Sequence, residues 1–315
     1  MQRMNNKSAK SIGAPCASLD LKKVLLSDRD VIDELLLRFP QRISGFTFAA
    51  LYSWNPVYRY EWTHCGLETL LISCLLPADG KRHFLQPVGN FGPDAQRLFL
   101  EALKKSGYPM KIYGVSSDFI RNYPEFLTHF DVENDPGLAN YIYRASDLAA
   151  LEGKFYAKKR NLIAQARKLY QWTVHPLTAE NSLECLEVLD QLDTTHNDFD
   201  QTLKNEDVAV REAIAHFSEL GQQGILIRVD GKAAAFTLYE ALTPEMAVVH
   251  FEKAARHYKG LYQIVNQETA KAIAAAGFSS INREEDLGIP GLRQAKLSYG
   301  PLETISSYTL LFKAI

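Results

Sequence analysis

Charged side chains gather densely towards the carboxyl terminus. Arg283, Glu284, Glu285 and Asp286 directly follow Phe278 to Asn282, a predicted buried strand. Charged groups are rarely buried unless they pair with each other or with a ligand. Two interpretations stay open: the carboxylates receive the ammonium group of a substrate, or they form an internal ion network in which Asp286 caps the next helix.

Cations near this cluster suggest a second kind of contact. Arg293 and Lys296 lie in a predicted short helix from Pro290 to Ser298. Together with Arg283 they could meet a phosphate group, because guanidinium and ammonium groups are the usual phosphate partners.

A strand predicted from Met246 to Phe251 carries the candidate base. Side chains alternate along a strand, so His250 and Glu252 are expected on the same sheet face. Glu252 is the candidate for taking a proton from an amine or hydroxyl, with His250 beside it. The alternative is local pairing with Lys253 or Arg256.

Lys159 is placed unusually on a predicted helix from Glu152 to Tyr170. At about 100° per residue, its position falls within the apolar stripe of that helix, whereas the other basic residues fall outside it. Lys159 must therefore extend to solvent, pair, or point into a cleft.

The predicted elements that hold these residues repeat one order. Each half of the 315-residue chain reads as helices, an antiparallel meander, a helix and a strand. We expect a mixed α+β protein with a flexible tail at 1–18 and domains at 19–147 and 148–315, the second carrying the site.

Composition excludes several classes of protein. The net charge of -2 argues against a protein that binds polyanions over its whole surface. Four scattered cysteines indicate neither a disulfide framework nor a zinc site. The spacing of His196, Asp198 and Asp200 is compatible with metal ligands, but such loops more often form turns, so no metal is predicted. No apolar run reaches membrane-spanning length, and we expect a cytoplasmic protein.

Several motifs carry a family resemblance. HFEKA, YKGLYQ, NQE, YAKKRNLI, ISGFTFAALYSW and especially INREEDLGIPGLRQAKLSY resemble bacterial proteins related to the C-terminal domain of phosphatidylglycerol lysyltransferase. The resemblance implies two tandem GNAT-type folds, as in Fem-type aminoacyltransferases. Tyr299 lies in the segment where GNAT enzymes can carry an acid.

The resemblance also implies a donor-binding loop. GNAT enzymes bind a pyrophosphate with the loop before a helix, since helix starts attract anions. That place is taken here by His257, Tyr258, Lys259, Gly260 and Tyr262. The loop lacks the second small residue of the acetyl-coenzyme A pattern.

The resemblance therefore favours acyl transfer, with an amino acid passing from a carrier such as aminoacyl-tRNA to an amine or hydroxyl. The acceptor would be a small molecule, a lipid or a peptide, and the carboxylates would suit a lysyl-like ammonium group. No tightly bound cofactor is expected, and the donor substrate is aminoacyl-tRNA or an acyl-coenzyme A. Alternatives are an acetyl-coenzyme A-dependent N-acetyltransferase and a non-catalytic module that binds tRNA through the basic helix from Lys154 to Lys168.

Overall fold

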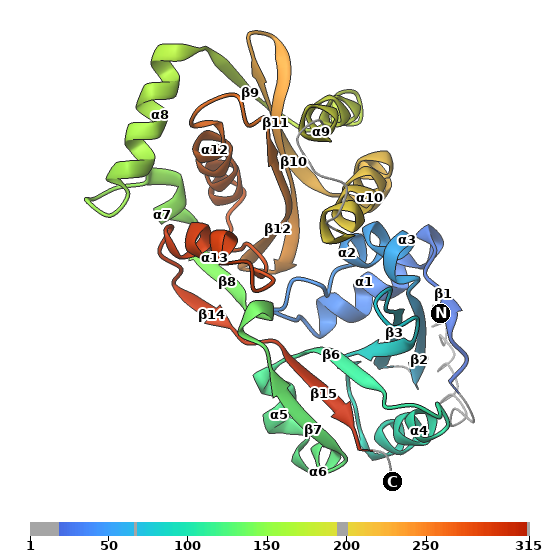
Figure 1. Cartoon of the computed structure of the whole chain (residues 1–315). Helices are drawn as coiled ribbons and strands as arrows, with labels where there is room; N and C mark the ends of the chain where they lie inside the picture. Colours follow the sequence, from blue (N-terminus) through green and yellow to red (C-terminus); the bar gives the residue numbers. More distant parts are fainter. Residues whose placement is uncertain (1–18, 66–67, 194–200, 314–315) are drawn as a thin grey trace, which may run out of the picture.

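A computed structural model describes residues 19–65, 68–193 and 201–313, and every structural statement below refers to these residues. The chain forms two mixed sheets, each flanked by helices (Figure 1). The predicted tail at 1–18 and the spacing of His196, Asp198 and Asp200 lie outside the described residues.

The first sheet has helices on both faces. α1 (Arg29–Arg38), α2 (Phe48–Ser53) and α3 (Asn55–Tyr58) lie on the side of the second sheet, whereas α4 (Pro93–Lys104), α5 (Ser117–Asn122) and α6 (Pro124–Leu127) lie on the far side. Alternation along β3 explains the two layers, since Leu70 packs with α1 and Leu71 packs with α4. The strand order is β1 (Lys22–Lys23), β2 (Glu61–Cys65), β3 (Thr69–Leu75), β4 (Arg82–Leu85), β6 (Lys111–Val115), β15 (Tyr308–Phe312) and β7 (Phe130–Asn134), with β5 (Val88–Gly89) paired to β3.

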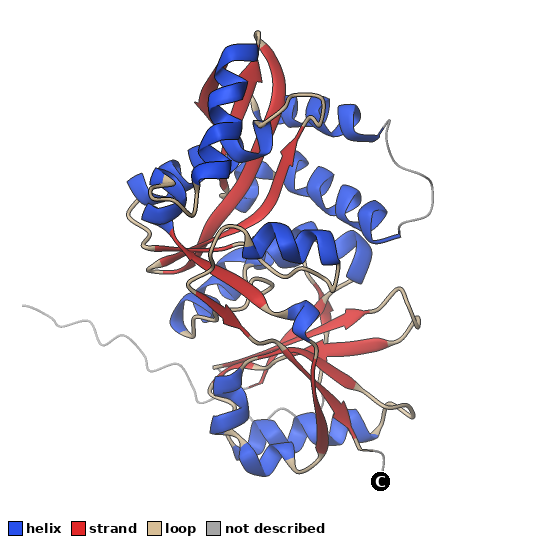
Figure 2. Ribbon diagram, turned by 60° about the vertical axis from the view of Figure 1, so that its left-hand side comes forward, coloured by secondary structure: helices blue, strands red, loops and turns tan. Residues whose placement is uncertain are grey.

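The second sheet is also covered on both faces (Figure 2). One face packs against α7 (Ala145–Ala150), α8 (Ala157–Leu169) and α12 (Leu261–Ala275), the other against α9 (Cys185–Asp193) and α10 (Gln201–Ala215), which α11 (Phe217–Leu220) follows. The strand order is β14 (Glu303–Ile305), β8 (Asn140–Arg144), β13 (Ser280–Asn282), β12 (Met246–Ala254), β11 (Lys232–Thr243), β10 (Gln223–Val229) and β9 (Trp172–Pro176).

The two sheets exchange strands across the predicted division at residue 147. β8 precedes that position yet pairs with β13 and β14 of the second sheet. β15, at the carboxyl end of the chain, pairs with β6 and β7 of the first sheet. Each sheet thus contains a strand from the other side of the predicted boundary, and these two strands connect the two units.

Local signals explain most element bounds. The predicted tight turn at Asp230-Gly231 closes the β10–β11 hairpin, and both residues have positive φ (50° and 81°), as a two-residue hairpin turn requires. The helix predicted from Glu152 begins later, at Ala157. Leu151 and Gly153 have positive φ (50° and 78°), a left-handed backbone that interrupts a right-handed helix.

Two buried asparagines join the units near the point where β12 and β13 separate. Asn282 Nδ2 donates to Asn140 Oδ1 and to the carbonyl oxygen of Arg42, both at 2.9 Å. Asn140 Oδ1 also accepts from the Ser44 backbone N–H at 2.8 Å. These bonds fix the loop before α2, which belongs to the first unit, against the second sheet.

Candidate functional site

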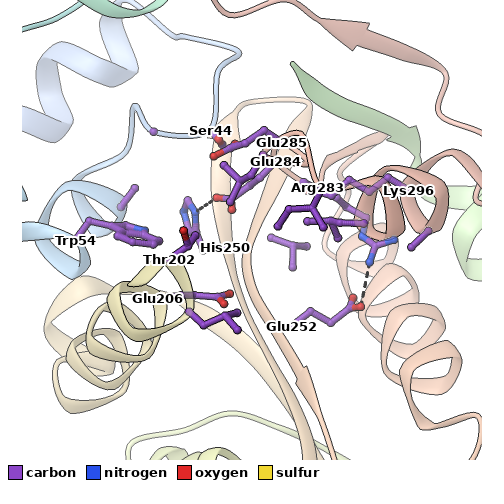
Figure 3. A pocket seen from close by; sticks show the side chains of 18 of the residues that line it. Ser44, Trp54, Thr202, Glu206, His250, Glu252, Arg283, Glu284, Glu285 and Lys296 are labelled. Carbon is purple, nitrogen blue, oxygen red and sulfur yellow. Dashed lines mark hydrogen bonds and ion pairs between the residues drawn. The ribbon is translucent and has the colours of Figure 1, made fainter. Parts of the chain in front are cut away.

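A cavity of about 740 Å³ opens where two parallel strands diverge. β12 and β13 pair only from Met246 to Val248, and β12 then continues to Ala254 while the chain after Asn282 turns towards β8. The divergence lets Val249, His250 and Glu252 line the cavity on one side and residues 283–285 on the other. The loop and helices of the first unit, α10, the start of α12 and α13 (Pro290–Leu297) close the remaining walls (Figure 3).

The expectation that His250 and Glu252 share a sheet face is wrong. Tyr239 pairs with Val249 and Leu238 with Phe251, so His250 is the extra residue of a β-bulge. A bulge shifts the alternation by one residue. His250 consequently faces α2 and α10, whereas Glu252 faces α12, and the two line different sides of the cavity (Figure 3).

His250 bridges two carboxylates. Its Nδ1 donates to Glu284 Oε1 (2.9 Å) and its Nε2 to Glu240 Oε1 (2.8 Å), with Thr47 Oγ1 at 3.4 Å from Nε2. Burial opposes the charged ring, but the bonds to both glutamates outweigh it and raise the pKa of His250 to about 10. Such an imidazolium has no free lone pair, so the arrangement does not suit the predicted role of a base.

The Glu252 carboxylate accepts hydrogen bonds from a guanidinium group and from a side-chain amide. Arg283 Nη2 donates to its Oε1 (3.0 Å), and Asn266 Nδ2 of α12 donates to its Oε2 (3.3 Å). The Arg283 guanidinium also lies 5.2 Å from the ring centroid of Tyr299. With both oxygens occupied and a cation beside it, Glu252 is better placed to orient Arg283 than to take a proton.

Lys159 points into the cavity, as one of the alternatives from its helical position allowed. Its Nζ donates to Ser298 Oγ (2.7 Å) and lies 4.1 Å from the ring centroid of Tyr299. Burial, and then the charge of Arg283, lowers the pKa of Lys159. Burial also raises the pKa of Tyr299 to about 12, so its hydroxyl keeps its proton at neutral pH.

Glu284, Glu285 and Lys296 form the wall opposite β12. Glu284 has a left-handed backbone (φ 59°), held by the bond to His250 and by its N–H donating to Asn282 Oδ1 (2.7 Å). Loss of hydration, and then the charge of Glu284, raises the pKa of Glu285 to about 7. Burial, and then Arg283, lowers the pKa of Lys296 to about 8.

Asp286 and Arg293 do not line the cavity. Arg293 Nε and Nη2 donate to the two oxygens of Asp286 (2.7 and 3.0 Å), and Tyr141 and the Gly288 N–H donate to the same carboxylate. The Arg293 bond, which outweighs burial, lowers the pKa of Asp286 to about 2. For this pair, the geometry matches the alternative of an internal ion network that fixes the loop.

Most of the predicted donor-binding loop lies outside the cavity lining. Of its five residues only Tyr262 lies in the lining. Gly260 (φ 84°) presses against α8 so closely that a Cβ would lie 2.7 Å from the Leu162 carbonyl oxygen. Tyr170 donates to the Lys259 carbonyl oxygen (2.8 Å), and its ring contacts that of Tyr258. His257 lies next to Tyr258 on the same loop.

Several lining residues were absent from the sequence prediction. Trp54, Tyr58 and Tyr60 come from the first unit, and Glu206 of α10 lines the cavity with them and pairs with Lys253 (2.7 Å). Glu240, which pairs with His250, was also missed. Nothing in the local sequence distinguishes these side chains from ordinary core or surface residues, because only the packing of the two units brings them together.

Neither a metal site nor a membrane span is found in the described part of the chain. No group of three or more His, Cys, Asp or Glu side chains there could hold a metal ion. None of the described helices combines the length and apolarity needed to cross a membrane.

Comparison with known proteins identifies the family. Residues 38–311 match the family described as "Phosphatidylglycerol lysyltransferase, C-terminal". A conserved protein of unknown function from Bacteroides thetaiotaomicron is 32% identical, with a TM-score of 0.86 over 93% of this chain and 99% of that one. No match was found among curated proteins.

More distant structures share the fold. L-PGS from Bacillus licheniformis is 15% identical, with a TM-score of 0.65 over 93% of each chain. FemX is 10% identical, with a TM-score of 0.60 over 94% of this chain and 98% of that one. The predicted α+β fold of two GNAT-like domains and its similarity to the Fem type are confirmed. The chain belongs to the phosphatidylglycerol lysyltransferase C-terminal family, which indicates a transferase of the acyl or aminoacyl class.

Proposed function

We propose that this protein is an aminoacyltransferase that moves an amino acid from an activated carrier ester, aminoacyl-tRNA, to an amine or hydroxyl acceptor. One observation carries the proposal: the cavity has an acidic side and a basic side, with a carboxyl group of near-neutral pKa between them. Aminoacyl transfer needs a base for the acceptor, cations for the developing oxyanion, and a place for the donor's ammonium group.

Glu285 is the proposed base. A base works best when its pKa lies near the working pH, and the pKa of Glu285 is about 7. The acceptor loses a proton to this carboxylate as its lone pair attacks the ester carbonyl carbon. The bond from that carbon to the carrier oxygen then breaks, and the carrier oxygen takes up the proton that Glu285 had accepted, which restores the carboxylate.

Arg283 and Lys159 are proposed to stabilise the oxyanion. Both are held against Tyr299, and the position of Arg283 is set by its bond to Glu252. Cations fixed in advance need little rearrangement when negative charge develops on the carbonyl oxygen. Lys296, whose Nζ donates to the Arg283 carbonyl oxygen, would provide a further positive charge while protonated.

The acidic side is proposed to receive the ammonium groups of the donor amino acid. Glu206 lines it together with the aromatic side chains of Trp54 and Tyr58. Carboxylates and aromatic faces both attract ammonium groups. This composition favours a cationic, lysyl-like amino acid over an apolar one.

The packing of the predicted donor-binding loop favours a carrier other than acetyl-coenzyme A. α8 lies against Gly260 at the start of α12, where a GNAT enzyme would hold a pyrophosphate. The Leu162 carbonyl oxygen, which repels anions, occupies the space beside the Gly260 backbone.

The proposal is tested by supplying the purified protein with tRNA charged with labelled lysine or another labelled amino acid, together with a primary amine. We expect a labelled amide to form faster than the ester hydrolyses. Calorimetry with coenzyme A is the comparison. Micromolar binding of coenzyme A, with acetyl transfer and no transfer from any aminoacyl-tRNA, would refute the proposal.

A further inference from the structure

The outer face of α8 carries an unusual concentration of positive charge. From Gly153 to Ala179 the sequence has no acidic residue, although the whole chain carries a net charge of -2. The solvent-facing basic side chains of this stretch are Lys154, Lys158, Arg160, Arg167 and Lys168.

The neighbouring loop enlarges this basic surface. The bond from Tyr170 to the Lys259 carbonyl oxygen holds the loop before α12 against the end of α8, and Lys259 is exposed. Trp172, at the start of β9, lies under the Arg167 guanidinium, 6.0 Å from ring centroid to cation. The exposed basic side chains of α8 and Lys259 are called the α8 surface below.

The helix that carries the α8 surface also contributes a residue to the cavity. Lys159 belongs to the same helix, but its side chain reaches inwards to Ser298 and Tyr299. A polyanion lying along the outside of α8 would therefore have its end within reach of the cavity wall. α8 has 13 residues, which corresponds to about 20 Å of helix.

We propose that the α8 surface binds the RNA part of the donor, so that the aminoacylated 3′ end enters the cavity beside Lys159. This inference rests on the proposed function, because it gives that function's donor a docking site. Lysine and arginine side chains bind the phosphate backbone independently of base sequence. The nearby aromatic rings of Tyr170 and Trp172 offer stacking partners for unpaired bases.

The outer face of α8 matches RNA better than a lipid surface. A helix that lies in a membrane interface needs a continuous apolar side. Here the exposed large apolar residues, Phe155 and Leu169, stand only at the two ends, and the side chains between them on the outer face are basic, polar or alanine.

The first test measures binding of deacylated tRNA to the whole protein as salt is varied. The variant Lys158→Glu/Arg167→Glu/Lys168→Glu reverses three charges of the α8 surface. The matched control, Lys23→Glu/Lys104→Glu/Lys105→Glu, reverses three exposed charges of the first unit. We expect the α8 variant to bind at least about tenfold more weakly and its salt slope to fall by about two to three, while the control stays within about twofold of the parent.

Equal weakening in both variants, or none in the α8 variant, would overturn the inference. So would an α8-dependent affinity for anionic phospholipid vesicles that exceeds the affinity for tRNA. Circular dichroism of each variant checks that the fold is retained.

A donor substrate without RNA allows the docking surface and the transferase activity to be tested separately. Aminoacyl-adenosine carries the ester but no RNA that could reach α8. We expect the α8 variant to use aminoacyl-adenosine at the parent rate and to lose at least about tenfold in kcat/KM with aminoacyl-tRNA. If the α8 variant uses aminoacyl-tRNA as well as the parent, the docking surface is wrong. If neither protein transfers from either donor while tRNA binding still depends on α8, the transferase proposal fails and the surface stands.

Discussion

Glu285 and Asp286 are neighbours in the chain, yet the fold gives them opposite environments. Asp286 is fully buried beside Arg293, which helps to lower its pKa to about 2. Glu285 faces the cavity, where lost hydration and the charge of Glu284 raise its pKa to about 7. The Asp286 carboxylate stays an anion at neutral pH, whereas Glu285 is able to exchange a proton there.

This difference shows why a block of charges should not be treated as one site. Asp286 accepts bonds from Arg293, Tyr141 and Gly288, so all of its acceptor capacity serves the loop. Residues with perturbed pKa values that line a cavity are the better candidates for chemistry. We therefore assign catalysis to Glu285 and loop structure to Asp286.

The largest expected effect comes from removing the proposed base. Glu285→Gln keeps the shape of the side chain but cannot accept the proton. Because general base catalysis contributes about a hundredfold to ten-thousandfold, we expect kcat to fall by at least about a hundredfold. The free energy of unfolding should not fall, since a desolvated carboxylate is removed. Steady-state transfer and urea unfolding give the two values, and near-parental activity in this variant would refute the role.

Removing the charge of Asp286, the neighbour of Glu285, should lower the free energy of unfolding rather than the activity. Asp286→Asn loses the ion pair with Arg293, and we expect the free energy of unfolding to fall by about 2 kcal/mol at pH 7. Since the pKa of Asp286 is lowered from 3.8, its anion stabilises the fold above that value, and the contribution is lost as pH falls towards 2. The difference between the parent and the variant in urea unfolding should therefore shrink below about pH 4. A constant difference down to pH 2 would contradict the pairing.

The pH dependence of the transfer rate tests whether Glu285 is the group that titrates. Glu285 must be ionised, so the rate should rise as pH passes through about 7, and it should fall as Lys296 deprotonates above about 8. The charges facing Glu285 are Glu284, His250 and Lys296, with Tyr58 and Tyr60 also nearby. Glu284→Gln removes a negative neighbour and should move the rising limb to lower pH.

His250→Gln provides the opposite control. It removes a positive neighbour and should move the rising limb of the pH profile to higher pH. If the limb stays in place in both variants, the titrating group is not Glu285.

The smallest expected effect is that of Arg293→Lys. Lysine keeps the charge but loses the two-point contact with Asp286, so the free energy of unfolding should fall by about 1 kcal/mol. Transfer activity should stay within about twofold of the parent, because Arg293 does not line the cavity. A large loss of activity without a loss of stability would assign Arg293 to the site instead.

Local sequence patterns predicted the elements well but the site only partly. Helical periodicity placed Lys159 on the inner side of its helix, and the turn at Asp230-Gly231 was recognised from residue type. The β-bulge at His250 has no local signal, because the shift appears only in pairing with β11. For the same reason, the exchange of β8 and β15 between the sheets could not be read from either segment alone.

The charged cluster shows the remaining limit. Arg283 to Asp286 form one run in the sequence, and only the left-handed turn at Glu284 and the contact with Arg293 separate cavity residues from loop residues. The aromatic wall from Trp54 to Tyr60 likewise depends on contact between the two units. Such tertiary contacts bring together residues whose local sequences contain no common pattern.

The most direct test measures transfer and stability in both neighbouring variants. Labelled product from aminoacyl-tRNA and the free energy of unfolding would be determined for the parent, Glu285→Gln and Asp286→Asn. We predict that Glu285→Gln is stable and inactive, whereas Asp286→Asn is destabilised but transfers at close to the parental rate while folded. An active Glu285→Gln variant, or no product from the parent with any aminoacyl-tRNA, would contradict this prediction.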